Sequence, residues 1–174
     1  NRDMILKIND MYDRSVIDFN KVFIKPNFVP EIHVEDNADK IRHQFIYIGR
    51  IGINKGTDVL FEAWKEMPED YRLIVCGEGD IECSLKNVEL MGQVQHDQVM
   101  HLLAASEAMI FLSRMYEGFP MTIVESFAAG TPVIGLNHGN GGDLLKSIYG
   151  SDKKLLPVSE HLKTDLIKTV EEFD

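Results

Sequence analysis

The sequence contains little cysteine, few basic residues and no long apolar run. Two cysteines, Cys76 and Cys83, occur among 174 residues, too few for a disulfide framework and without the spacing of a metal site. A net charge of -10 argues against a general nucleic-acid-binding protein, because phosphates require a basic surface. The shortage of cysteine favours a protein of the reducing cytoplasm.

Signals for membranes and secretion are missing as well. The longest apolar runs, such as 108–112, fall far short of the roughly 20 residues of a membrane span, and no secretory signal opens the chain. The chain starts with NRDMILKIND, so we expect a fragment of a longer protein. With 44% hydrophobic and 26% charged residues, its composition is typical of one globular domain.

Segments typical of strands and of helices alternate along the chain. Runs rich in β-branched and aromatic residues predict strands at 44–49, 71–77, 88–92, 108–113 and 132–136, with 22–27 as a further candidate. Helical spacing of apolar residues predicts helices at 55–67, 96–106, 121–129 and 162–173, and a short helix near 80–86 that contains Cys83. Because the strands are apolar almost throughout, we predict an α/β fold: a doubly wound, Rossmann-like parallel sheet.

Ligands of such sheets bind at the carboxyl ends of the strands. The loops expected at that edge are 49–56, 77–80, 92–97, 113–120 and 136–143. GEG at 77–79 matches a dinucleotide-binding fingerprint only in part, because Glu82 stands at the place of the third glycine. We therefore disfavour a nicotinamide enzyme and interpret Gly77 and Gly79 as a tight turn whose backbone approaches a ligand.

Two cations and a helix start at this edge suggest a diphosphate site. Arg50 follows a strand and Lys55 opens the next helix, which supplies a planar guanidinium fork and a point charge for phosphate oxygens. Pro120 marks a second helix start, where the free N–H groups of Met121 and Thr122 suit phosphate. The alternative is a solvated loop with surface charges.

Two glutamates, Glu117 and Glu125, flank that second helix start. Carboxylates accept hydrogen bonds from vicinal hydroxyls, so one acid could bind a sugar and the other a ribose on either side of a diphosphate. A role as partner of the helix dipole suits Glu117 better than Glu125, which lies on an apolar segment. A glycosidase pair is a further alternative, disfavoured by the cationic surroundings.

The histidines show no metal-binding spacing. His96 and His101 are five positions apart, and no carboxylate completes a zinc-protease motif. Surface or capping roles are the simplest interpretation for the histidines. His138, in the glycine-rich stretch LNHGNGGD, is the one that we expect near a ligand.

Together these motifs resemble the C-terminal, donor-binding half of the retaining GT-B glycosyltransferases, the glycosyl transferases group 1 family. The resemblance runs from Val22 to Gly142 and rests on IKPN, FIYIGRIGINKG, LIVCGEG, VELMGQV and EGFPMTIVESFAAGTPVIG, with seven residues between the two glutamates. It implies that 1–21 is a lead-in from a missing N-terminal domain and that 22–174 is the Rossmann-like, nucleotide-sugar-binding domain. Where the family often has a glutamate in a Pro-containing turn, Asp143 follows Gly142 directly, so the tail matches less well.

The resemblance also implies residue roles. Arg50, Lys55 and Glu117 would be catalytic: the two cations would bind the diphosphate and stabilise the leaving nucleotide, and Glu117 would hold hydroxyls of the donor sugar. Glu125 would hold the ribose, and Val94 would lie beside the base. The remaining expected contacts to the donor come from the start of the helix: Gly118, Phe119, Pro120, Met121 and Thr122.

The implied activity is hexosyl transfer from a UDP-, GDP- or ADP-sugar to an acceptor hydroxyl in polysaccharide or glycolipid synthesis. No metal or other cofactor is expected, because the cations supply the positive charge. The acceptor, a glycan or lipid, would bind through the missing domain, so the fragment alone would be inactive. We expect a cytoplasmic protein, with peripheral association of the full protein at the inner membrane face left open. The alternatives are a non-catalytic sugar-nucleotide-binding module and half of a nucleotide-sugar epimerase.

Overall fold

Six parallel strands form the centre of the structure, a computed structural model that describes residues 2–12, 14–23, 39–152 and 154–173. Their order in the sheet is β3-β2-β1-β4-β5-β6, and every neighbouring pair is parallel. The predicted doubly wound, Rossmann-like α/β fold is thereby confirmed. The strands are β1 (Ile41–Ile48), β2 (Arg72–Cys76), β3 (Val88–Gly92), β4 (Ser106–Phe111), β5 (Val133–Leu136) and β6 (Leu155–Leu156).

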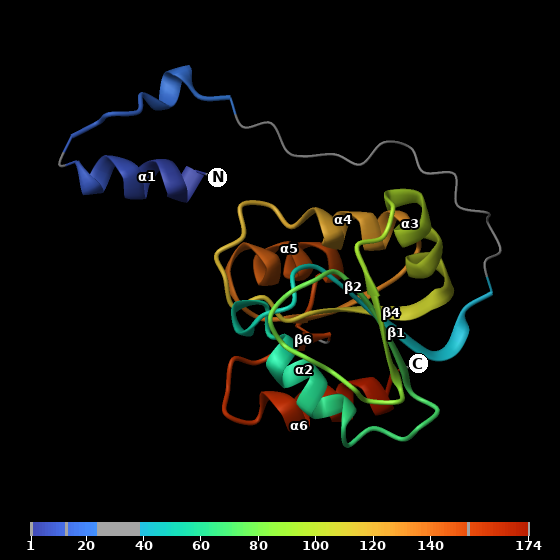
Figure 1. Ribbon diagram of the computed structural model, residues 1–174. Helices are drawn as coiled ribbons and strands as arrows, with labels where there is room; N and C mark the ends of the chain where they lie inside the picture. The colour runs from blue at the N-terminus through green and yellow to red at the C-terminus, as the bar shows by residue number, and fades with distance from the viewer. Residues whose placement is uncertain (1, 13, 24–38, 153, 174) are drawn as a thin grey trace.

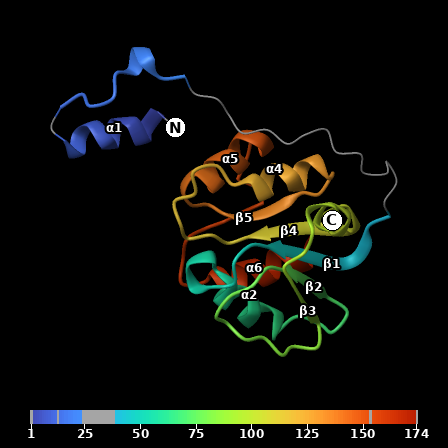
Figure 2. The same cartoon turned by 45° about the horizontal axis from the view of Figure 1, so that its top comes forward.

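Helices cover both faces of the sheet, as Figures 1 and 2 show. Helices α3, α4 and α5 lie on one face, and α2 and α6 lie on the other. Helix α1 lies outside these layers. The helices are α1 (Arg2–Met11), α2 (Thr57–Trp64), α3 (His96–Ala105), α4 (Met121–Ala128), α5 (Gly139–Tyr149) and α6 (Leu162–Glu171), with short 3-10 helices η1 (Phe19–Lys21) and η2 (Ile53–Lys55).

Each face of the sheet has its own core. On β1, Phe45 packs with Trp64 of α2, whereas its neighbour Ile46 packs with Leu103 of α3 and Ile123 of α4. This alternation is the two-residue period of a strand. Because both faces are buried, the strand sequences are apolar at nearly every position.

The connection between β2 and β3 corrects one prediction. No helix is present near 80–86; residues 81–85 form an irregular segment, so Cys83 is not helical. Ile81, Cys83 and Leu85 are partly buried against the core on the α2 and α6 side. Apolar residues at every second position indicate an extended chain, so the helical period assigned to this segment was wrong.

Two further boundaries differ from the sequence-based expectation. Strand β4 runs from Ser106 to Phe111, whereas the predicted strand was 108–113. Both of its ends therefore lie two residues earlier, which leaves Leu112 and Ser113 in the following loop. The expected loop 136–143 is shortened, because α5 begins at Gly139. Glycines at three of the first four positions of α5 hid this helix, since glycine is a poor helix former. The candidate strand 22–27 lies almost wholly outside the described residues.

None of the helices that the structure describes is long and apolar enough to cross a membrane.

Candidate functional site

A cavity lies where the sheet order reverses. Strands β1 and β4 are neighbours in the sheet, but their connections lead to opposite sides, and such a switch point opens a crevice at the carboxyl ends of the strands. The cavity there has a volume of about 190 Å³. Its lining comes from the ends of β1 and β4, the loops after them and the start of α4: Tyr47, Ile48, Gly49, Lys55, Phe111, Leu112, Ser113, Glu117, Phe119, Pro120, Met121 and Thr122.

The loop after β1 is shaped by its own hydrogen bonds. The Tyr47 hydroxyl donates to the carbonyl of Arg50 (2.7 Å), and the hydroxyl of Thr57 accepts from the N–H of Gly52 (2.8 Å). Gly56 has a φ of 76°, and a Cβ there would lie 2.5 Å from both Cβ and O of Leu112. Only glycine fits this close approach, which brings Lys55 next to the loop after β4.

Arg114 ties the two loops together. Its guanidinium donates to a carboxylate oxygen of Asp58 at 3.0 Å and to the carbonyl of Ile53 at 2.6 Å, while its backbone N–H donates to the carbonyl of Asn54 at 2.9 Å. Three contacts from one residue therefore fix the loop after β4 against the loop that carries Lys55.

Lys55 and Glu117 form an ion pair inside the cavity. The ammonium lies 2.5 Å from Oε1 of Glu117, and the two side chains are 25% and 22% exposed. The hydroxyl of Ser113 donates to the same oxygen at 2.7 Å. Burial alone would raise the pKa of Glu117, but the hydrogen bonds from Lys55 and Ser113 and the charge of Lys55 outweigh it and lower that pKa. Glu117 is therefore an anion at neutral pH.

The start of α4 forms the opposite wall. Residues 119–122 line the cavity, and the N-cap residue Pro120 makes no capping hydrogen bond through its side chain. Its first N–H groups and the helix dipole thus favour an anion here. The amide of Asn140, from α5, donates to the carbonyls of Glu117 (2.6 Å) and Gly118 (3.3 Å) and holds the loop before α4.

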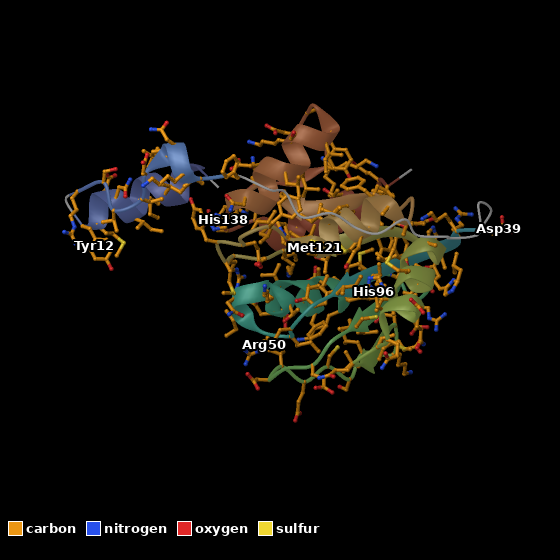
Figure 3. The ribbon with its side chains drawn as sticks, turned by 90° about the horizontal axis from the view of Figure 1, so that it is seen from above. Tyr12, Asp39, Arg50, His96, Met121 and His138 are labelled. Carbon is orange, nitrogen blue, oxygen red and sulfur yellow. The ribbon has the colours of Figure 1, made fainter. Side chains whose placement is uncertain are left out.

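Arg50 and Val94 lie apart from the cavity lining. Arg50 is exposed on the loop after β1. Figure 3 shows it, with His138, on the part of the sheet and its helices that lies away from Asp39. Val94 is partly buried against the core beneath α3 and α4. The structure therefore brings Lys55, Glu117 and the start of α4 together, and leaves Arg50 at the same edge but outside the cavity.

Glu125 has different surroundings from Glu117. It lies in the second turn of α4, its side chain is 17% exposed, and it is not part of the cavity lining. Its carboxylate faces His96 at the start of α3, with 3.4 Å between Nε2 and Oε1. The imidazole is 55% exposed and its Nδ1 lies 4.0 Å from Asp97.

A family model places this architecture among known proteins. The model described as glycosyl transferases group 1 matches residues 28–150, well over half of the chain. The chain belongs to the glycosyl transferases group 1 family. Curated relatives carry matching names: D-rhamnosyltransferase WbpZ of Pseudomonas aeruginosa is 27% identical over 126 residues, 67% of this chain and 32% of that protein. The putative teichuronic acid biosynthesis glycosyltransferase TuaC of Bacillus subtilis is 29% identical over 113 residues, 64% of this chain and 28% of TuaC.

Solved glycosyltransferase structures share the fold. A TarM variant of S. aureus, crystallised with Fondaparinux, alpha-GlcNAc-glycerol and UDP, superposes with a TM-score of 0.70 at 18% identity, over 99% of this chain and 36% of TarM. Anabaena HepE in complex with UDP and glucose gives a TM-score of 0.60 at 20% identity, over 74% of this chain and 37% of HepE. The chain spans about a third of the length of the curated relatives that head the comparison.

In this member of the group 1 family, Gly77 and Gly79 pack closely against the loop after β1. A Cβ on Gly77 would lie 1.9 Å from the carbonyl oxygen of Gly49, and one on Gly79 would lie 1.8 Å from that of Ile51. The two loops are also joined by a hydrogen bond from the N–H of Ile51 to the carbonyl of Glu78 at 2.8 Å. The neighbouring loop therefore packs closely against this turn, and an approach of its backbone to a ligand stays a prediction.

Several residues of the site had not been singled out from the sequence. Ser113 and Asn140 hold Glu117 and its loop, and Tyr47 shapes the loop after β1.

His138, which the sequence had singled out, is the N-cap residue of α5, and its ring packs edge-on against Tyr116 with centroids 5.9 Å apart. Among the described residues, no group of three or more His, Cys, Asp or Glu side chains could hold a metal ion.

Proposed function

We propose that this chain is the C-terminal, donor-binding half of a retaining GT-B glycosyltransferase, which binds a nucleotide-sugar and transfers the sugar to an acceptor hydroxyl. The observation that carries the proposal is the cavity at the β1/β4 switch point, where Lys55, Glu117 and the start of α4 meet. A cation and free helix N–H groups suit a diphosphate, and a carboxylate suits sugar hydroxyls.

The dimensions of the cavity accord with half of an active site. Its volume of about 190 Å³ is below the roughly 300–1,000 Å³ of complete small-molecule sites. In this proposal the missing N-terminal domain closes the other side, binds the acceptor glycan or lipid and excludes water. The fragment alone would therefore bind donor but transfer little sugar.

The proposed reaction breaks the bond between the anomeric carbon and the diphosphate oxygen. Negative charge develops on the departing diphosphate, where Lys55, Arg50 and the start of α4 stabilise it. The acceptor hydroxyl attacks the oxocarbenium-like sugar from the same face and gives its proton to an oxygen of the departing diphosphate. Glu117 orients the sugar through its hydroxyls, Glu125 binds the ribose, and the backbone near Val94 lies beside the base. The proposal includes no metal ion.

The donor is proposed to be a hexosyl nucleotide, with UDP tested first because the TarM and HepE structures that share this fold contain UDP. We place the complete enzyme in polysaccharide or glycolipid synthesis in the cytoplasm, with membrane association through the missing half. The name of TuaC, a putative glycosyltransferase of teichuronic acid biosynthesis, supports a role in polysaccharide synthesis.

Calorimetry tests the proposal directly. UDP, GDP and ADP are titrated into the chain and into its Arg50→Ala and Glu125→Ala variants. We expect one nucleotide to bind best and each variant to weaken it. Absence of binding by any nucleoside diphosphate to the folded wild-type chain would contradict the proposal.

A second assay separates an enzyme from a non-catalytic module. The missing N-terminal domain is restored, and the release of nucleoside diphosphate and the formation of glycoside are followed with a panel of acceptors. Binding without transfer would favour the module, and release of an epimerised sugar nucleotide would favour an epimerase.

A further inference from the structure

Glu117 places a negative charge where the diphosphate of the donor must bind. Its Oε1 lies 2.5 Å from the ammonium of Lys55, and both side chains line the same cavity. We infer that Glu117 acts as an internal anion that competes with phosphate for Lys55, and that it thereby selects sugar-linked nucleotides over free nucleoside diphosphates. This inference rests on the proposed function of the site.

Glu117 is held in position independently of Lys55. The hydroxyl of Ser113 donates to Oε1 of Glu117 at 2.7 Å, and the Ser113 residue is only 4% exposed. The same hydroxyl oxygen accepts the N–H of Met115 at 3.3 Å. The long, flexible side chain of Lys55 is therefore the partner that moves when phosphate arrives, while the carboxylate stays in the cavity.

Arg114, which joins the two loops of the cavity, does not relieve the competition. The guanidinium of Arg114 pairs with Asp58 at 3.0 Å. Among the described residues, Lys55 is the cation that forms an ion pair with Glu117. Both side chains are about three-quarters buried, so solvent and salt screen their interaction less than they screen a surface pair. A phosphate bound to Lys55 therefore meets the repulsion of the adjacent carboxylate.

A donor sugar changes this balance. Its hydroxyls donate hydrogen bonds to Glu117, and these replace the hydrogen bond that the carboxylate loses when Lys55 turns to the phosphate. A free nucleoside diphosphate has no such donors, and its terminal phosphate carries more negative charge than the esterified phosphate of a nucleotide-sugar. The same carboxylate thus favours binding of the substrate and release of the nucleotide product.

Inorganic pyrophosphate is the probe of choice, because it carries neither base nor sugar. Calorimetry in a metal-free buffer with EDTA compares the wild type with Glu117→Gln, which keeps the shape of the side chain and removes its charge. We expect pyrophosphate and UDP to bind about three- to tenfold more tightly to the variant. Glu62→Gln on α2 is the matched control, because it removes the same charge from a surface pair with Lys65; we expect a change of less than about twofold there.

A second measurement uses the sugar itself. The affinity for UDP-glucose divided by the affinity for UDP is expected to fall in Glu117→Gln, because a neutral amide accepts hydrogen bonds from the sugar hydroxyls more weakly than a carboxylate does. Glu117→Ala must move pyrophosphate binding in the same direction as Glu117→Gln. Pyrophosphate binding to Glu117→Gln that is no tighter than to Glu62→Gln would overturn the inference.

The outcomes distinguish this inference from the proposed function. If the folded wild-type chain binds neither pyrophosphate nor UDP, GDP or ADP, the proposed function fails and the inference fails with it. If the wild type binds these anions and Lys55→Met weakens them, but Glu117→Gln does not tighten them, the inference alone fails.

Discussion

The two glutamates that flank the start of α4 have different surroundings. Glu117 lies on a loop, lines the cavity and accepts hydrogen bonds from Lys55 and Ser113. Glu125 lies within the helix, outside the cavity lining, and faces the imidazole of His96. A fixed spacing in the sequence therefore does not make two acids equivalent. One shares its cavity with the proposed phosphate-binding cation, and the other belongs to a contact between α3 and α4.

The largest effect on the difference between the two glutamates is expected from a substitution that pushes apart the loops around Glu117. Gly56→Ala places a Cβ 2.5 Å from Leu112 at a φ of 76°, so we expect a loss of about 3 kcal/mol in the free energy of unfolding. Gly130→Ala is the control, because φ is 71° there but no atom lies within 4 Å; we expect about 1 kcal/mol. Urea denaturation measures both, and equal losses would contradict the close approach.

Removal of the cation beside Glu117 should have the next largest effect. Lys55→Met is expected to weaken binding of the preferred nucleoside diphosphate about tenfold or more, because a charge-assisted hydrogen bond to phosphate is lost. Lys65→Met, at the C-cap residue of α2 that pairs with Glu62 at the surface, is the control. Calorimetry compares the two, and an equal effect of both changes would argue for general electrostatic attraction instead of a site.

The contact between His96 and Glu125 tests the other acid. His96→Ala should weaken binding of a ribonucleoside diphosphate about three- to fivefold, because the carboxylate proposed to hold the ribose loses its partner. The 2′,3′-dideoxy analogue should bind both proteins equally. His101→Ala, on the same helix and also exposed, is the control. If the dideoxy analogue loses as much affinity as the ribonucleotide, His96 does not act through the ribose hydroxyls.

The smallest expected effect is a dependence of stability on pH. The pKa of Glu117 in the folded chain is lower than its ordinary value of 4.5. Its contribution to stability is therefore complete above that value and is lost as the pH falls through the lowered pKa. The difference in unfolding free energy between the wild type and Glu117→Gln should thus shrink from pH 7 to pH 3. In a Lys55→Met background this pH dependence should be reduced; an unchanged dependence would exclude the ion pair as its source.

Local sequence patterns predicted most of the fold. Apolar runs that end at glycine located the strands, and Pro120 and Gly130 marked the two ends of α4. The prediction failed where local signals conflict with packing. Residues 81–85 pack as an extended segment, and the glycines at the start of α5 concealed a helix.

The candidate site was predictable only in part, because no local sequence motif determines the order of the strands in the sheet. The sequence placed Lys55 and Glu117 at the same edge of the sheet, but the adjacency of β1 and β4 brings them together. Ser113 and Asn140 act through contacts across four and 23 positions, to Glu117. An isolated serine or asparagine gives no signal of such a role.

The hydrogen bonds of Arg114 have a consequence for affinity. They join the two loops of the cavity through contacts within the chain itself. The conformational entropy of bringing these loops together is therefore lost during folding and not during association. A donor that enters this cavity meets a preorganised wall, so more of its interaction energy remains as net affinity.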